Sequence, residues 1–599
     1  MTDPSAMVTA MRTHTCGELR LAHAGEQVAL CGWVAHRRDH GGVTFIDLRD
    51  REGVVQIVFH PEDAPAAHAA AQELRGEWVV RIMGVVRERP EGMANADLVT
   101  GAVEVAATSV EVLNSAETPP FVIEDRTEAD ELLRLEYRYL DLRRPEMTRG
   151  LRLRHEINRT IREHMDPLGF LEVETPVLTT ATPEGARDFL VPSRMFPGSF
   201  YALPQSPQQL KQLLMVAGQD RYYQIVRCLR DEKPRADRGL EFTQLDVEMS
   251  FAEEEDVMAV IEPLYARIVR ETQGADVSTP FRRMSYDEML ERYGSDKPDL
   301  RYGMELSEFT ELFEGSGFTS FAKVAADGGA IKGLVAPQGA AALSRKELDK
   351  LVEDAKGRGA AGLVWIAVED EGALRSPVEK FLSDEERTGI LERTGAGAGD
   401  LVCLVADRID RTNVALDGLR RDLAARLDLI SEDRWEFVWY FEPPLFDWSD
   451  EEDKWVSNHH PFTAPLTDDL EPRTAKARAY DLVLNGFELG GGSIRIHDPE
   501  VQQRVFEVLG LSHDEIEGKF GHLIRAFRFG APPHGGIALG IDRLAMLMAG
   551  KDAIRDVQAF PKAQSGADPL MGGPSPVDPV QLRELGIRVI EPPRAEGEH

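Results

Sequence analysis

Residues 230–246 read RDEKPRADRGLEFTQLD, and this stretch predicts two strands joined by a polar loop. Cationic side chains stand at Arg230 and Arg238, and Phe242 follows in the second strand. Nucleotide chemistry needs cations on phosphate oxygens and an apolar surface against the base. The pattern therefore indicates a nucleotide site; the alternative is a hairpin with surface salt bridges.

A glycine-rich segment near the C-terminus is a second candidate for phosphate binding. GGIALGIDRLAML (535–547) places glycines before a helix that we expect to begin near Asp542. Glycines let the backbone approach a ligand, and Arg543 projects from the helix start toward phosphate. The segment is neither GxxxxGK[ST] nor GxGxxG, which excludes those ATP- and NAD-binding motifs.

Two more segments carry candidate site residues. LGFLEVETPVL (168–178) predicts a turn and a strand after a long helix, and Pro176, which lacks a backbone donor, suits a sheet edge or an interface. Alone it is equally typical of an ordinary helix–turn–strand. GGGSIRI (490–496) contributes Arg495, between the polar loop and the glycine-rich segment in chain order.

Composition sets the broad class of the protein. With 599 residues and 42% hydrophobic content, the chain suits roughly three or four domains. No run of about 20 apolar residues predicts a membrane span, and the N-terminus shows no secretory signal. The four cysteines lie far apart without a CxxC pair, which argues against a disulfide framework or a structural zinc site. We therefore expect a cytoplasmic protein.

The net charge of −34 at first sight opposes binding to nucleic acid. Screening, however, limits the reach of each charge to about 8 Å at physiological salt. The stretch from Arg134 to Arg162 contains nine arginines and only four carboxylates, and Arg37 and Arg38 lie near the start of the chain. The sequence therefore permits a basic stripe on an acidic body.

Changes in periodicity divide the chain into α+β domains. Five or so alternating strands and one helix before residue 115 predict a Greek-key barrel of the OB type, a common reader of single-stranded nucleic acid. Later strands and helices follow no repeating βαβ order, which predicts an antiparallel sheet. The predicted segments are a barrel (1–115), a linker (116–143), a main domain in two parts (144–290 and 426–560), an inserted α+β domain (291–425) and a C-terminal extension (561–599).

The four segments, in this order and spacing, are similar to the signature motifs of class II aminoacyl-tRNA synthetases. The resemblance to the bacterial-type aspartyl-tRNA synthetases covers essentially the whole chain. It implies an anticodon-binding barrel, a catalytic domain on an antiparallel sheet, an inserted domain and a homodimer interface around Pro176. The segments that carry it are TPEGARDFLVPSR (182–194), FYALPQSPQ (200–208), HHPFTAP (459–465), YDLVLNGFELGGGSIRIHD (480–498) and APPHGGIALGIDRL (531–544).

The resemblance implies a site for L-aspartate. Arg495 and Lys211 match the arginine and the lysine that hold the side-chain carboxylate of the substrate, and Asp246 matches their organiser. The other positions implied for aspartate are Glu184, Gln208, Arg230, His459 and His460.

The resemblance also implies sites for ATP and Mg²⁺. Arg230 would hold the α-phosphate, Glu232 the adenosine and Arg543 the γ-phosphate. Asp481 and Glu488 match magnesium ligands; because seven residues separate them, they would lie on opposite faces of a regular strand, so we expect an irregular turn at Asn485-Gly486. The catalytic set is Arg230, Glu232, Glu488 and Arg543, and the other nucleotide positions are Asp231, Gly239, Phe242, Gly540, Ile541 and Asp542.

Departures from the family pattern lie beside these positions. Gly239 stands where a glutamine usually contacts the nucleotide, and Lys233-Pro234 and Gln209-Leu210 replace other usual pairs. None of them removes a charged catalytic group, so activity should survive.

In the barrel, the resemblance implies contacts to the anticodon. Phe45 offers a stacking face, although alone it would predict a core aromatic. His40 and Gly92 match residues of relaxed members, where strict members carry leucine and lysine, so we expect charging of both tRNA(Asp) and tRNA(Asn), with strict charging of tRNA(Asp) as the alternative. The other implied anticodon positions are Arg37, Arg38, Gln56 and Glu104.

Two rival interpretations remain. One is an asparaginyl- or lysyl-tRNA synthetase, but Lys211 and the ELGGGSIRI context favour an acidic substrate. The other is a catalytically inactive paralogue that acts as an RNA-binding module. The retained Arg230, Glu232, Glu488 and Arg543 argue against it.

Overall fold

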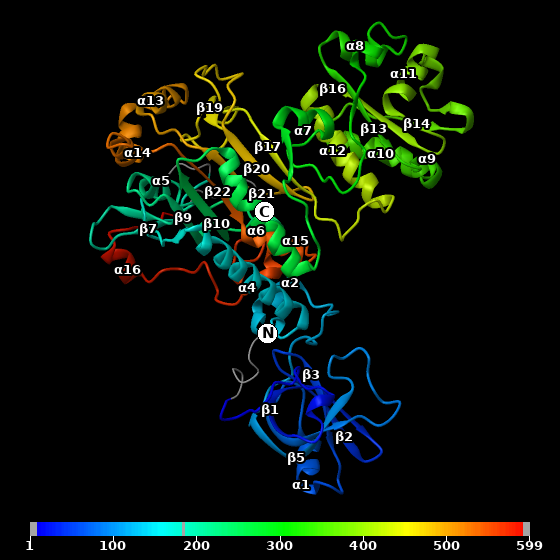
Figure 1. Cartoon of the computed structure of the whole chain (residues 1–599), viewed down its shortest axis with the longest axis vertical. Coiled ribbons are helices and arrows are strands. Elements are labelled where there is room, and N and C mark those ends of the chain that lie inside the picture. The colour runs from blue at the N-terminus through cyan, green and yellow to red at the C-terminus, as the bar shows by residue number, and fades with distance from the viewer. Residues whose placement is uncertain (1–8, 182–185, 591–599) are drawn as a thin grey trace. The chain divides into compact units, whose positions relative to one another are not determined.

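The computed structural model describes residues 9–181 and 186–590 (Figure 1). These residues form two compact units. One contains the described residues up to Leu153 together with Asp552–Pro576, and the other contains Arg154–Lys551 and the described residues from Val577. Within the described ranges, no helix has both the length and the apolarity that crossing a membrane requires.

The first unit contains the predicted five-stranded barrel. Alternate side chains of the strands point inward and form one apolar core with residues such as Ile46, Leu48 and Val80. The closed order is β1-β2-β3-β5-β4, and only β3 and β5 pair in parallel. The elements are η2 (Leu21–His23), β1 (Gln27–His40), β2 (Val43–Arg49), β3 (Val54–Phe59), α1 (Pro65–Glu73), β4 (Val79–Glu88) and β5 (Val103–Asn114).

The arginine-rich stretch does not form the basic stripe that the sequence permits. It folds into α2 (Glu131–Glu136), α3 (Arg138–Asp141) and α4 (Pro145–Met165). Each of its nine arginines lies within 4.0 Å of a carboxylate. Asp141, fully buried, accepts hydrogen bonds from Arg138 (2.5 Å) and Arg144 (2.7 Å). Four of these partners, among them Glu77 and Asp542, are distant in sequence, so counting local charges missed part of the neutralisation.

An eight-stranded sheet organises the second unit. Its order is β11-β17-β20-β21-β22-β10-β9-β6, antiparallel throughout except for the parallel pairs at its two edges. This agrees with the predicted antiparallel sheet. The strands are β6 (Leu171–Glu172), β9 (Arg221–Leu229), β10 (Glu241–Ser250), β11 (Arg282–Ser285), β17 (Phe437–Phe441), β20 (Ala479–Leu484), β21 (Phe487–Ile494) and β22 (His534–Gly540).

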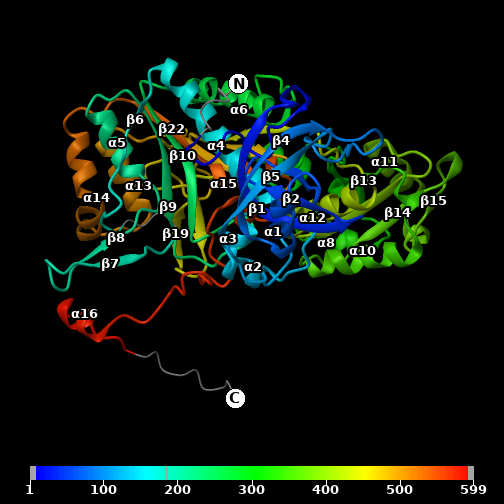
Figure 2. The ribbon, with the colours of Figure 1, turned by 90° about the horizontal axis from the view of Figure 1, so that it is seen from below.

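Helices and two short hairpins surround this sheet. In Figures 1 and 2, α5, α13 and α14 lie together, and Phe462, Phe506 and Phe520 form an apolar cluster between them. The remaining elements are η3 (Asp166–Leu168), β7 (Leu190–Pro192), β8 (Phe200–Ala202), α5 (Gln208–Val216), α6 (Glu254–Gln273), α7 (Tyr286–Tyr293), β18 (Phe446–Ser449), β19 (Lys454–Ser457), α13 (Pro499–Val508), α14 (His513–Phe527), α15 (Ile541–Met548) and α16 (Pro579–Glu584); η7 (Ile554–Val557) belongs to the first unit.

An inserted α+β fold interrupts the second unit between β11 and β17. Its antiparallel sheet, in the order β12-β13-β16-β14-β15, is buried on both faces, and Figure 2 shows α10 and α11 on opposite sides. β16 (Leu401–Asp407, LVCLVAD) is accordingly an almost continuous apolar run. The other elements are β12 (Ser307–Glu308), η4 (Thr310–Phe313), α8 (Thr319–Ala326), β13 (Ala330–Ala336), α9 (Gly339–Ala342), α10 (Arg345–Gly357), β14 (Val364–Val368), η5 (Asp370–Gly372), β15 (Leu374–Arg375), η6 (Glu379–Phe381), α11 (Asp384–Thr394) and α12 (Ile409–Arg426).

The buried Asp141 cluster gives a test of stability. We expect Asp141→Ala to destabilise the first unit by about 3–5 kcal/mol, because the buried guanidiniums of Arg138 and Arg144 lose their carboxylate. Denaturant unfolding monitors the change, and Asp63→Ala, at an exposed position, is the control. Equal unfolding midpoints for the two variants would contradict this role of Asp141.

Candidate active site

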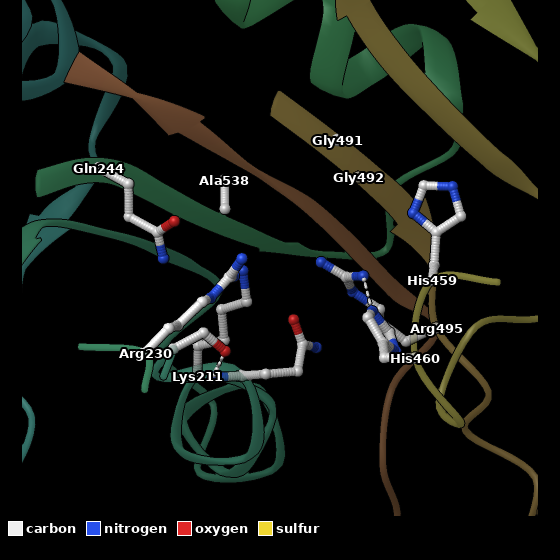
Figure 3. Close-up of a pocket in the computed structure, with 11 residues that line it drawn as sticks. Lys211, Arg230, Gln244, His459, His460, Gly491, Gly492, Arg495 and Ala538 are labelled. Atoms are coloured by element: carbon white, nitrogen blue, oxygen red, sulfur yellow. Dashed lines mark hydrogen bonds between the residues drawn. The ribbon is translucent and has the colours of Figure 1, made fainter. Parts of the chain in front are cut away.

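A cavity of about 130 Å³ lies on one face of the eight-stranded sheet (Figure 3). Strands β10, β21 and β22, the start of α5, the residue that follows β9 and the loop after β19 supply its walls. Among the described residues, Lys211, Arg230 and Arg495 are the charged groups that line it, and no carboxylate does. The complete lining is Ser206, Gln208, Lys211, Arg230, Gln244, His459, His460, Gly491, Gly492, Arg495 and Ala538.

Two buried carboxylates lie behind two of these cations. Glu248 accepts hydrogen bonds from Nε (2.9 Å) and Nη2 (3.1 Å) of Arg495, and Asp246 accepts one from Nζ of Lys211 (2.7 Å). Lys211 also lies 3.2 Å from Glu248. All four side chains are at most 3% exposed. Burial of this kind requires close pairing, because an unpaired charge in the interior is strongly destabilising.

The surroundings shift the pKa values in this cluster. Burial opposes the charge of Glu248, but Arg495 and Lys211 hold the pKa of its carboxyl below the usual value. Burial likewise opposes the charge of Arg495, and Glu248 nevertheless raises its pKa. For Asp246, burial is the larger effect and raises the pKa, against the attraction of Lys211. Arg495 and Glu248 therefore form an ion pair.

Two adjacent histidines line the cavity as neutral groups. Burial lowers the pKa of His459 to about 4 and that of His460 well below its usual value, with a further contribution from Arg495 in the second case. Nη1 of Arg495 donates to Nε2 of His460 (2.6 Å) and to Oγ of Ser493 (2.6 Å). His460 therefore orients the guanidinium without adding charge.

Glycines in β21 and β22 leave room for these polar groups. A Cβ on Gly536 would lie 2.2 Å from a carboxylate oxygen of Glu248, and a Cβ on Gly491 would lie 2.2 Å from Oδ1 of Asp481. A Cβ on Gly490 would lie 1.9 Å from the carbonyl oxygen of Ala538. The glycine-rich sequence therefore permits close strand approach and buried carboxylates on the same sheet.

The predicted polar loop joins β9 to β10 beside the cavity. The guanidinium carbon of Arg230 lies 5.0 Å from the ring centre of Phe242, as in a cation–π contact. Nε of Arg230 is buried and finds no hydrogen-bond partner among the described residues. Glu232 and Gly239 are half-buried in the loop and Asp231 is exposed.

Arg543 stands at the start of α15 and contacts the polar loop. Its Nη1 donates to the carbonyl oxygen of Glu488, and its Nη2 lies 3.3 Å from Oδ2 of Asp237. Asp542, by contrast, is bonded to Arg154 and to the backbone N–H of Thr243 (2.5 Å). Its carboxylate therefore anchors the helix start to β10 and α4, and Gly540 and the buried Ile541 bring the chain into the helix.

Asp481 and Glu488 lie on two paired strands, β20 and β21. The chain reverses at Asn485 (φ 50°) and Gly486 (φ 87°), where we expected a turn. Because Glu488 pairs with Val483, which shares a face of β20 with Asp481, both carboxylates project from the same face. Asp481 accepts a hydrogen bond from Tyr440 (2.6 Å), and its Oδ1 is buried and without a hydrogen-bond partner among the described residues.

Three other predicted residues differ in where they lie relative to this cavity. Glu184 falls in the segment 182–185, outside the described residues. Pro176 is exposed beyond the short edge strand β6. Gln208 lines the cavity and donates to Gln212 (3.1 Å). Sequence reasoning missed Ser206, Gln244, Glu248 and Tyr440, although the i, i+2 spacing of Asp246 and Glu248 on one strand was a usable signal.

Most of the predicted anticodon positions are at least partly exposed on the first unit, whereas Glu104 is buried. Phe45 is half-buried between the core-facing Thr44 and Ile46, so it points away from the barrel core. Glu104 accepts hydrogen bonds from Gln56 (2.8 Å) and Arg87 (2.8 Å). Arg37 and Arg38 are paired with Asp39 and Asp47, and His40 and Gly92 are exposed.

Two protein-family profiles match the chain. The profile described as tRNA synthetases class II (D, K and N) matches residues 130–564, and that of an OB-fold nucleic acid binding domain matches residues 28–113. An asparaginyl-tRNA synthetase from Pyrococcus horikoshii, solved with asparaginyl-adenylate, shares the fold with a TM-score of 0.59 over 92% of this chain and 98% of that one, at 20% identity.

Full-length relatives are much more similar. The aspartate–tRNA(Asp/Asn) ligase of Desulfatibacillum aliphaticivorans is 51% identical over 97% of this chain and 98% of its own. The ligase of the same name from Moorella thermoacetica is 53% identical over 96% of each chain. The chain therefore belongs to the class II tRNA synthetases of the aspartate, lysine and asparagine group.

Proposed function

We propose that the protein activates L-aspartate with ATP and transfers it to tRNA. The observation that carries this proposal is the cavity wall, which presents Lys211, Arg230 and Arg495 and places its carboxylates behind two of these cations. Such a wall attracts an acidic substrate. The nearby loop of Arg230 and Phe242 suits a nucleotide.

Activation requires the α-carboxylate of aspartate to attack the α-phosphorus of ATP in line. The nucleophile is already ionised, so no strong base is needed, and catalysis depends on positioning and charge neutralisation. Arg230, whose Nε has no hydrogen-bond partner among the described residues, would hold the α-phosphate. Arg543 would hold the γ-phosphate. The terminal ribose hydroxyl of tRNA then attacks the aspartyl-adenylate, which transfers the amino acid.

Asp481 and Glu488 fit a magnesium site. The buried Oδ1 of Asp481 lacks a hydrogen-bond partner among the described residues, and Nε2 of the neutral His459 lies 3.7 Å from it. Burial together with Glu488 raises the pKa of Asp481 well above its usual value. The described residues offer no cluster of three or more such ligands, so phosphate and water would complete the coordination, which Mg²⁺ favours. When bound, Mg²⁺ would neutralise phosphate charge.

Charge, not shape, separates aspartate from asparagine. Two unit charges about 4 Å apart attract by about 4 kcal/mol at an effective dielectric of 20. Asparagine offers no such charge to Arg495 and Lys211, so the pocket selects aspartate without an editing site.

We expect Arg495→Leu to reduce aspartate-dependent ATP–pyrophosphate exchange by about a thousandfold, because about 4 kcal/mol of attraction is lost. Arg478→Leu is the matched control, since it breaks an ion pair with Glu254 that lies outside the cavity lining. Thermal unfolding of both variants checks that they fold. Near-normal exchange by a folded Arg495→Leu variant would refute the assignment.

The contact of Arg543 with Asp237 predicts competition with ATP. A γ-phosphate on Arg543 has to replace the Asp237 carboxylate 3.3 Å away. We expect Asp237→Asn to lower the KM for ATP by about two- to fivefold, the range for a partly exposed ion pair, with the KM for aspartate unchanged. Glu241→Gln, which breaks the pair with Arg227 on the same hairpin, is the control. An unchanged KM for ATP would mean that Asp237 does not compete.

We propose that the protein charges both tRNA(Asp) and tRNA(Asn). The support is His40 and Gly92 on the barrel surface, together with relatives named aspartate–tRNA(Asp/Asn) ligase. The outward-facing Phe45 and the Gln56–Glu104 pair offer a stacking face and hydrogen-bonding edges to bases.

Aminoacylation assays with tRNA(Asn) and tRNA(Asp) side by side test whether the protein charges both. We expect the wild-type protein to charge purified tRNA(Asn) and tRNA(Asp), and the double variant His40→Leu/Gly92→Lys to retain only tRNA(Asp). Both positions are exposed, but Gly92 has a φ of +77°, where a lysine is strained, so thermal unfolding checks the fold of the variant. Pyrophosphate exchange, which needs no tRNA, is the control. Failure of the wild-type protein to charge tRNA(Asn) would establish the strict alternative.

We also propose a homodimer formed around Pro176. Large apolar side chains next to it are exposed, including Val177 (60%) and Leu178 (52%), and the β7–β8 hairpin adds Met195 and Phe196. Apolar exposure on this scale is typical of a surface that another protein covers.

A further inference from the structure

The chain passes between the catalytic sheet and the inserted fold twice, and both crossings contact one turn. The outgoing crossing is residues 294–303, after α7, and the returning crossing is residues 427–436, before β17. The turn is Asn485-Gly486, which joins β20 to β21. It lies between Asp481 and Glu488, the carboxylates that fit a magnesium site.

The returning crossing is hydrogen-bonded to Asn485. Oδ1 of Asn485 accepts from the backbone N–H of Glu436 (3.0 Å), and Nδ2 donates to the carbonyl oxygen of Arg434 (2.8 Å). The backbone N–H of Asn485 donates to the carbonyl oxygen of Glu436 (3.3 Å). These three bonds hold the turn against the strand that leads into β17.

The outgoing crossing packs against Gly486. A Cβ on this glycine would lie 3.2 Å from Cβ of Asp299, and the φ of +87° already disfavours any other residue. Arg434 donates to the carbonyl oxygen of Arg301 (3.0 Å) and so ties one crossing to the other.

The inserted fold holds the outgoing crossing through a fully buried arginine. Arg420 on α12 donates to the carbonyl oxygens of Asp299 (2.6 Å), Tyr302 (3.0 Å) and Gly303 (3.2 Å). Its guanidinium also lies over the rings of Tyr302 (4.5 Å) and Tyr293 (4.9 Å). A continuous series of contacts therefore leads from α12 through Asp299 to Gly486.

We propose that the inserted fold positions the two metal-binding carboxylates through this turn, with Arg420, Asp299 and Asn485 as positioning residues. The proposal rests on the proposed function, in which Asp481 and Glu488 bind Mg²⁺. Magnesium demands near-ideal octahedral geometry at about 2.0–2.1 Å, so a small change in the separation of two carboxylates lowers its affinity. A hairpin clamped on both sides of its turn keeps that separation constant.

The test compares two glycine substitutions with the same backbone requirement. Gly486→Ala adds a Cβ against Asp299, whereas Gly550→Ala, at a φ of +61°, adds a Cβ with no atom within 4 Å. We expect Gly486→Ala to raise the Kd for Mn²⁺, measured by electron paramagnetic resonance in the presence of ATP, by about tenfold relative to Gly550→Ala. The Kd for aspartate, measured by equilibrium dialysis without ATP, should stay the same in both variants.

Arg420→Met is the second variant, because it keeps an apolar stem and removes the hydrogen bonds to three carbonyl oxygens of the crossing. It should raise the Kd for Mn²⁺ in the same direction. If both folded variants bind Mn²⁺ as Gly550→Ala does, or if aspartate binding falls equally, the proposal is overturned. If Gly486→Ala does not fold, the Arg420→Met result decides in either direction.

A failure of the metal assignment itself would look different. In that case the Asp481→Asn and Glu488→Gln variants would bind Mn²⁺ as tightly as the wild-type protein. The two failures are therefore distinguishable in one set of titrations.

Discussion

The buried ion pair between Arg495 and Glu248 is the constraint on which the site depends. It joins β10 to the end of β21 across the intervening strand β22, and the adjacent pair of Lys211 and Asp246 adds α5. Neither cation could be buried to this extent without its carboxylate. Each carboxylate in turn needs space, which explains why Gly536 faces Glu248. The buried charge pairs, the close spacing of the strands and the glycines therefore depend on one another.

The same arrangement explains how a nearly neutral cluster can bind an anion. Two cations and two carboxylates cancel overall, but the carboxylates lie behind the cations and not on the cavity wall. A ligand carboxylate therefore meets the ammonium of Lys211 and the guanidinium of Arg495 before it meets either carboxylate, and low local dielectric strengthens those contacts. His459 and His460 are neutral because burial lowers their pKa values, so they add no charge to this field, and His460 accepts a hydrogen bond from Arg495.

Local patterns in the sequence predicted the parts of this site, and long-range pairing determined the rest. The barrel and the antiparallel sheet follow from periodicity, the inserted fold follows from a shift in composition, and the polar loop is the β9–β10 hairpin. Glu248 was missed although it stands two residues after Asp246, because its partner Arg495 lies 247 positions away. The turn between Asp481 and Glu488 at Asn485-Gly486 was predicted from their seven-residue separation, but the pairing that puts both carboxylates on one face was not. The assigned ligands of these residues stay predictions.

The neutralised arginines change the physical picture of how an acidic protein binds RNA. With a net charge of −34 and no unpaired arginine between Arg134 and Arg162, long-range attraction is weak. On the barrel, Arg37 and Arg38 are paired as well, with Asp39 and Asp47. A phosphate that binds there must replace a carboxylate in the correct geometry, so its net gain is small. Recognition then depends on stacking and base-edge contacts at Phe45, Gln56 and Glu104, which respond to sequence and not to charge.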